Sequence, residues 1–164
     1  RYLLLYNFIF LRVLDYFIYL FGHLFWAEKT MAQNIEAIFE IEVSIRELAI
    51  HLVKAYEVWF SRYTSGTFGE QTFLPIQTYS TFVNRLEQAQ NRWSQLLRNL
   101  SEDQLNASFY YWDFGNTLQE RKLLQVLTHL PLHSAYHRGQ IALLLRQNNI
   151  KVHPTDFVIY KPVI

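Results

Sequence analysis

The chain contains no cysteine among its 164 residues. This absence excludes disulfides, thiolate-rich zinc sites and a cysteine nucleophile. A metal ion would therefore need His, Asp or Glu ligands, and any reacting thiol would have to arrive with a substrate. Excess charge of one sign is also lacking, because the formal net charge is +1 and the Lys and Arg residues form no basic run. We therefore expect no nucleic-acid partner.

The composition indicates a globular protein, since 51% of the residues are hydrophobic and 18% are charged. A chain of this length is large enough to bury one core without disulfides or other cross-links. We therefore expect residues 1–164 to form a single domain.

The first 21 residues are unusually apolar, and the run continues to about residue 26. Its length would suffice to span a bilayer, but Arg12 and Asp15 would then lie near mid-membrane at a high free-energy cost. As a signal peptide the run is too long and lacks a small-residue cleavage site. We expect this segment to be helical and buried in the domain or in a homodimer interface, and the protein to be cytoplasmic. A membrane-anchored domain is the less favoured alternative.

Apolar residues recur at steps of three and four along most of the chain, which predicts helices. The first predicted helix ends at residue 38 and the second begins near Ser44. Two further helices are predicted over residues 77–99 and 123–148. The spacing of Ser44 and Glu47 fits a capping box, and Ser101 and Gln104 repeat it before a short helical turn. Residues 61–75 are predicted to be a long loop, and residues 108–119 a possible small β-hairpin. The prediction is an all-α four-helix bundle with a long crossover between the second and third helices.

The last predicted helix carries histidines where apolar residues should face the core. His133 and His137 share one face with Val126, Leu130, Ile141 and Leu144, and lie one turn apart, so both can bind one metal ion. His129 lies about 12 Å along the axis from His137, so these two cannot share an ion. A His129–His133 pair is the competing arrangement. Pro131 should kink this helix or mark a local start.

Three stretches of the sequence resemble the DinB/YfiT-like family. The most specific is HLPLHSAYHRGQIALLLRQNNI, which is similar to the final-helix signature of that family, His-x-x-x-His followed at once by Arg-Gly-Gln. The stretches HLFWAEKT and SIRELAIHLVKAYEVWFSRYTSG are similar to its first and second helices, and the tail KVHPTDFVIY also fits. The resemblance covers about residues 23–160. It implies a four-helix bundle that runs up-down-down-up.

The resemblance also implies three metal ligands, His51, His133 and His137, with zinc or nickel as the usual ion. Residues that could support them are His129, Tyr136, Arg138, Gln140 and Glu57. Gly139 faces away from the ligands and lowers helix propensity, so we expect another helix, from this chain or a second subunit, to approach it closely.

Three protein ligands leave coordination positions open for water or substrate, as in catalytic sites. Because the family includes transferases that use small thiols, the implied function is a metal-dependent hydrolase or transferase. It would activate a small thiol or water toward an electrophilic substrate. The alternative is a catalytically silent, metal-stabilised bundle that acts as a dimeric interaction protein.

Overall fold

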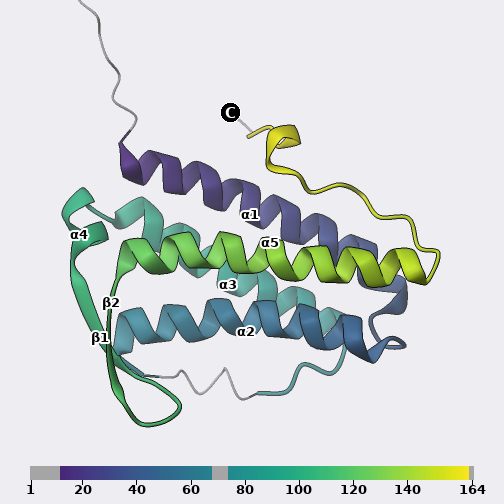
Figure 1. Ribbon diagram of the computed structural model, residues 1–164, viewed down its shortest axis with the longest axis horizontal. Coiled ribbons are helices and arrows are strands. Elements are labelled where there is room, and N and C mark those ends of the chain that lie inside the picture. Colours follow the sequence, from purple (N-terminus) through teal and green to yellow (C-terminus); the bar gives the residue numbers. More distant parts are fainter. Residues whose placement is uncertain (1–11, 68–73, 163–164) are drawn as a thin grey trace, which may run out of the picture.

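Four long helices lie side by side in the computed structural model, which describes residues 12–67 and 74–162 (Figure 1). They are α1 (Val13–Ile35), α2 (Val43–Ser65), α3 (Tyr79–Asn99) and α5 (Leu123–Gln147). The helices α2 and α3 run parallel to each other and antiparallel to α1 and α5, so the chain runs up-down-down-up. The predicted all-α bundle is confirmed, while residues 1–11 of the apolar first segment lie outside the described residues.

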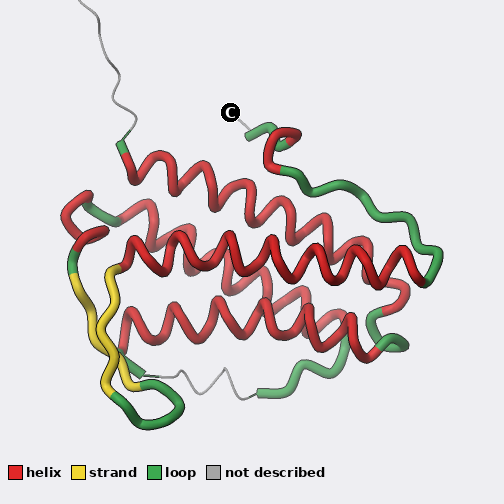
Figure 2. The backbone as a smooth tube through the Cα atoms, in the orientation of Figure 1, coloured by secondary structure: helices red, strands yellow, loops and turns green. Residues whose placement is uncertain are grey.

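The shorter elements connect the long helices or follow the last of them (Figure 2). They are the 3-10 turns Glu36–Ile38 and Phe157–Ile159, helix α4 (Glu102–Asn106), and strands β1 (Ser108–Trp112) and β2 (Leu118–Lys122). The two strands pair antiparallel, with Ser108 opposite Lys122, so the predicted hairpin before the last helix is confirmed. In the described part of the chain, no helix combines the length and apolar character needed to cross a membrane.

The crossover begins one turn later than the sequence predicts. Residues 61–65 belong to α2, and Gly66 ends the helix in the left-handed conformation (φ +70°) with its N–H donating to the Arg62 carbonyl at 3.1 Å. Glycine is suited to this conformation because it has no Cβ to clash with the backbone. The Thr64 and Ser65 hydroxyls donate to carbonyls four residues earlier, each at 2.8 Å, which lets these polar residues remain helical.

The two predicted capping boxes have different outcomes. Helix α2 begins at Val43 after Glu42, so Ser44 lies inside the helix and the box predicted there is wrong. The Ser101 box is confirmed, with the Ser101 backbone N–H donating to Gln104 Oε1 at 2.8 Å. An N-cap residue needs an extended backbone, which Ser101 has (φ −97°, ψ 159°).

Helix α5 continues through Pro131 without interruption, so the alternative of a local start there is wrong. The helix ends as predicted near residues 148–149. Asn149 adopts the left-handed conformation (φ 57°). The Asn149 and Ile150 N–H groups donate to the carbonyls of Arg146 (3.0 Å) and Leu145 (2.9 Å), which satisfies the last turn.

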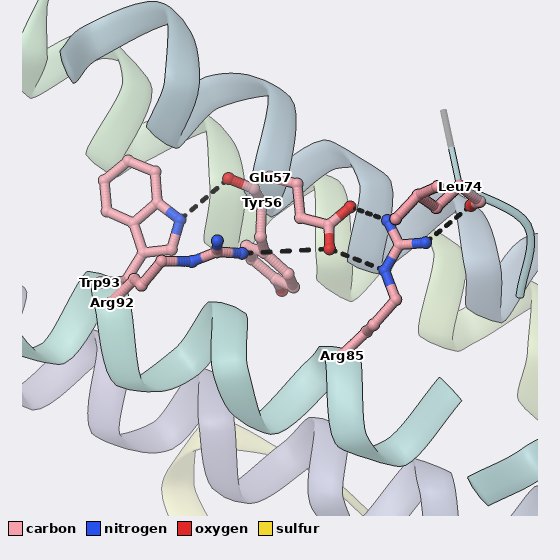
Figure 3. A network of polar contacts seen from close by, with 6 residues as sticks. All are labelled: Tyr56, Glu57, Leu74, Arg85, Arg92 and Trp93. Atoms are coloured by element: carbon pink, nitrogen blue, oxygen red, sulfur yellow. Dashed lines mark hydrogen bonds and ion pairs between the residues drawn. The ribbon is translucent and has the colours of Figure 1, made fainter. Parts of the chain in front are cut away.

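A buried ion pair fastens α2 to α3 and to the end of the crossover (Figure 3). Arg85 Nε donates to Glu57 Oε1 at 2.9 Å, Arg85 Nη2 pairs with Glu57 Oε2, and Arg85 Nη1 donates to the Leu74 carbonyl at 2.7 Å. The side chains of Glu57 and Arg85 are only 3% and 7% exposed. Arg92 Nη2 lies 3.9 Å from Glu57 Oε1 and is 34% exposed. Glu57 therefore forms its ion pairs with side chains of α3 rather than supporting the histidines.

Candidate metal centre

Helices α2 and α5 bring together the three histidines that the resemblance implies. His51 comes from α2, and His133 and His137 come from successive turns of α5. One ring nitrogen from each lies within 4.8 Å of the other two. The ring centroids are 4.5 to 4.9 Å apart, so the rings converge on a common point. Such a set of imidazoles can hold one divalent ion.

The His133 ring shows that a ligand fits this space. Its Nε2 is buried and has no hydrogen-bond partner in the described chain. A buried polar atom without a partner costs about 1–3 kcal/mol. A cation held between the three rings would give Nε2 a partner, so the residues present fit a metal ion.

The protonation of the histidines also favours metal binding. Burial, and after it the neighbouring His137, His51 and His129, together lower the pKa of His133 to about 4. The pKa of His51 is lowered first by burial and then by His137. A neutral imidazole is the form that binds a metal, so these two rings are ready to bind near neutral pH.

Gln140 orients one of the three rings. His137 Nδ1 lies 2.7 Å from Gln140 Oε1, and because an amide oxygen only accepts, Nδ1 carries the proton and donates. The Nε2 atom of His137 is then unprotonated and free to bind a metal. Hydrogen bonds of this kind fix the tautomer and orientation of metal-binding histidines. Of the five supporting residues predicted, Gln140 contacts a candidate ligand through a hydrogen bond.

Two other predicted residues contact the cluster through their rings. His129 is exposed, stacks on His133 with centroids 5.1 Å apart, and meets Trp59 edge-on at 5.8 Å. It lies outside the group of three histidines whose ring nitrogens come together. Tyr136 is 65% exposed and meets the edge of the His137 ring at 5.1 Å.

Arg138 lies on the core side of α5, in a buried polar network that sequence reasoning missed. Its Nη1 donates to Ser134 Oγ at 2.5 Å, and Ser134 Oγ donates to Glu28 Oε1 at 2.5 Å. The Tyr56 hydroxyl donates to the same carboxylate oxygen. Burial raises the pKa of Glu28 more than these hydrogen bonds lower it. The network therefore links α1, α2 and α5 inside the bundle.

The chain is similar in sequence to known proteins. The model of the DinB family matches residues 28–163. The chain belongs to the DinB family. A curated member, Protein DinB of Bacillus subtilis (strain 168), is 25% identical over 134 residues, which cover 78% of this chain and 76% of that protein. No solved structure matches at a significant level.

The DinB family match includes all three histidines and leaves out the apolar segment 1–21. Gly139 does not meet the expectation of a close helix within the described chain, because a Cβ added there would contact nothing within 4 Å. His23 has a structural role, since its Nε2 donates to the Thr155 carbonyl at 3.0 Å. A sequence signal for Glu28 did exist, because it interrupts the apolar row formed by Leu24, Met31 and Ile35.

Proposed function

We propose that this DinB family protein binds a divalent transition metal, zinc or nickel, through His51, His133 and His137. The observation that carries the proposal is the convergence of the three rings, with the buried Nε2 of His133 having no hydrogen-bond partner among the described residues. We further propose that the site acts on a small thiol or water and an electrophilic substrate, as a transferase or hydrolase. The protein would act as one domain in the cytoplasm.

The residues around the site would each have a different role. A divalent ion bound here would lower the pKa of a thiol or water at an open coordination position. Gln140 holds the His137 ring in its metal-binding tautomer, and burial keeps His133 neutral. His51 is exposed, so small molecules can approach the site from the α2 side. Because the chain has no cysteine, the thiol must come from solution.

Metal content tests the ligand assignment. Protein purified without chelator should contain close to one transition-metal ion per chain by elemental analysis. His133→Ala should lose the ion, because two histidines remain, whereas His153→Ala should retain it, since His153 lies outside the cluster. Wild-type protein with only trace metal, or full occupancy in His133→Ala, would contradict the assignment.

Cobalt substitution tests the reaction class. Addition of small thiols to the cobalt protein should produce a sulfur-to-cobalt charge-transfer band in the near-ultraviolet. The band should disappear in His133→Ala. A cobalt spectrum that no thiol alters would exclude thiol activation and leave either a water-dependent reaction or the silent bundle.

One observation favours the second candidate, a dimeric interaction protein. The side chains of Leu132, Tyr136 and Leu143 are exposed by 67%, 65% and 55%, and share one face of α5 with Gly139. An apolar stripe with a glycine at its centre suits close packing against the same helix of a second copy. Wild-type protein should then sediment as a dimer, and Leu132→Glu should sediment as a monomer that keeps its metal. A monomeric wild-type protein would contradict this candidate.

A further inference from the structure

Arg138 is a buried cation with few partners. It is 7% exposed, and its one hydrogen bond to the described residues runs from Nη1 to the neutral hydroxyl of Ser134. Its Nε has no hydrogen-bond partner, and no described carboxylate lies within ion-pair distance of the guanidinium. Glu28 is the neighbouring carboxylate, but the Ser134 hydroxyl stands between the two charges. A guanidinium in this setting retains capacity for an anion.

A cavity of about 420 Å³ is lined by Arg138 on α5 and by residues of the C-terminal stretch. The stretch returns from the end of α5 toward α1 (Figure 1), and the hydrogen bond from His23 to Thr155 holds it in place. The basic residues that line the cavity are Arg138, Arg146, His23 and His153. Asp156 is the one acidic residue among the described residues that line it. The volume is in the range of small-molecule sites.

The cavity is separate from the histidine cluster. At about 100° per residue, Ala142 and Arg146 point roughly 140° and 180° away from His137 around the axis of α5. Both residues line the cavity. A molecule bound here would therefore contact the opposite side of α5 from the metal.

We propose that this cavity binds a small molecule carrying an oxyanion, with Arg138 and Arg146 as its anchoring residues. The planar guanidinium matches the two oxygens of a carboxylate or phosphate. Val152, Pro154 and Phe157 form apolar walls that suit the carbon part of such a molecule. The inference goes beyond the proposed metal chemistry and does not depend on it.

Calorimetric titration of the purified protein tests the proposal, with inorganic phosphate and glutarate as probes at constant ionic strength. At least one probe should bind saturably at millimolar concentrations, and the preferred probe separates phosphate from carboxylate recognition. Arg146→Gln should weaken binding about tenfold, because a charge-assisted hydrogen bond is lost. Ala142→Leu should abolish binding by filling the cavity. Lys151→Gln is the matched control, since it removes an exposed positive charge that does not line the cavity.

Several outcomes would overturn the proposal. They are the absence of saturable binding of both probes, equal weakening by Arg146→Gln and Lys151→Gln, and unchanged binding in Ala142→Leu. Binding that disappears in His133→Ala but persists in Ala142→Leu would place the anion on the metal. A wild-type dimer that Ala142→Leu dissociates, without anion binding, would assign the space to a second copy.

Discussion

The Glu57–Arg85 pair permits a quantitative test of the fold. Replacing Arg85 with leucine leaves a carboxylate that is 3% exposed, with only Arg92 at 3.9 Å. Breaking a buried ion pair by removing one partner costs about 3–5 kcal/mol, because the remaining charge is uncompensated. At about 2–4 °C per kcal/mol for a chain of this size, Tm should fall by about 6–20 °C.

The double variant separates the cost of an orphaned charge from loss of packing. Glu57→Leu combined with Arg85→Leu removes both charges and should recover most of the loss. It should not recover all of it, because the Leu74 carbonyl loses its 2.7 Å hydrogen bond, at a cost of about 1–3 kcal/mol. Urea denaturation followed by far-ultraviolet circular dichroism measures these free energies.

An exposed ion pair supplies the control. Arg12 and Asp15 are 65% and 35% exposed, so Arg12→Leu should be much milder than Arg85→Leu. The reasoning fails if Arg85→Leu is as mild as Arg12→Leu. It also fails if the double variant is no more stable than Arg85→Leu, because uncompensated charge would then not be the source of the cost.

The remaining predictions concern the site and the end of α5. In metal-free protein, the pKa of His133 is about 4 against an ordinary 6.5, so the unfolded chain binds this proton more tightly. Above pH 6.5 the neutral His133 ring therefore contributes about 2 kcal/mol, after solvent screening, to the free energy of unfolding. This contribution is lost as the pH falls toward 4. Urea midpoints across this range should show the loss in wild-type protein and not in His133→Ala. Gln140→Leu should weaken metal binding about 10- to 100-fold in competition with a chromophoric chelator, and unchanged affinity would exclude an orienting role. Asn149→Ala should destabilise by about 1 kcal/mol in urea while Asn149→Gly should not, because φ is positive there, and equal midpoints would contradict this account.

The fold was largely predictable because the apolar periodicity of the long helices is a local signal. The errors arose where the same residue spacing is compatible with two backbone conformations. The Ser44 and Ser101 segments share the capping-box pattern, but only Ser101 has the extended conformation that a cap needs. The predicted loop over residues 61–65 failed because hydroxyl groups can bond back to their own helix.

The candidate site was only partly predictable from spacing. His133 and His137 are neighbours within one helix, so their pairing follows from the helical repeat. His51 lies on another helix, and only the resemblance to known proteins indicated it. The contact between Glu28 and Ser134 joins residues 106 positions apart, so no local pattern reveals that contact.

Several roles fall on the single helix α5, and this affects how the protein can change by design or evolution. One helix carries two of the three candidate ligands, the polar network of Ser134 and Arg138, and the exposed stripe through Gly139. Most substitutions on it would therefore disturb two roles together. The third candidate ligand, His51, is exposed on α2. Exchange of His51 for a carboxylate is thus the substitution by which metal preference can change while the rest of the bundle stays as it is.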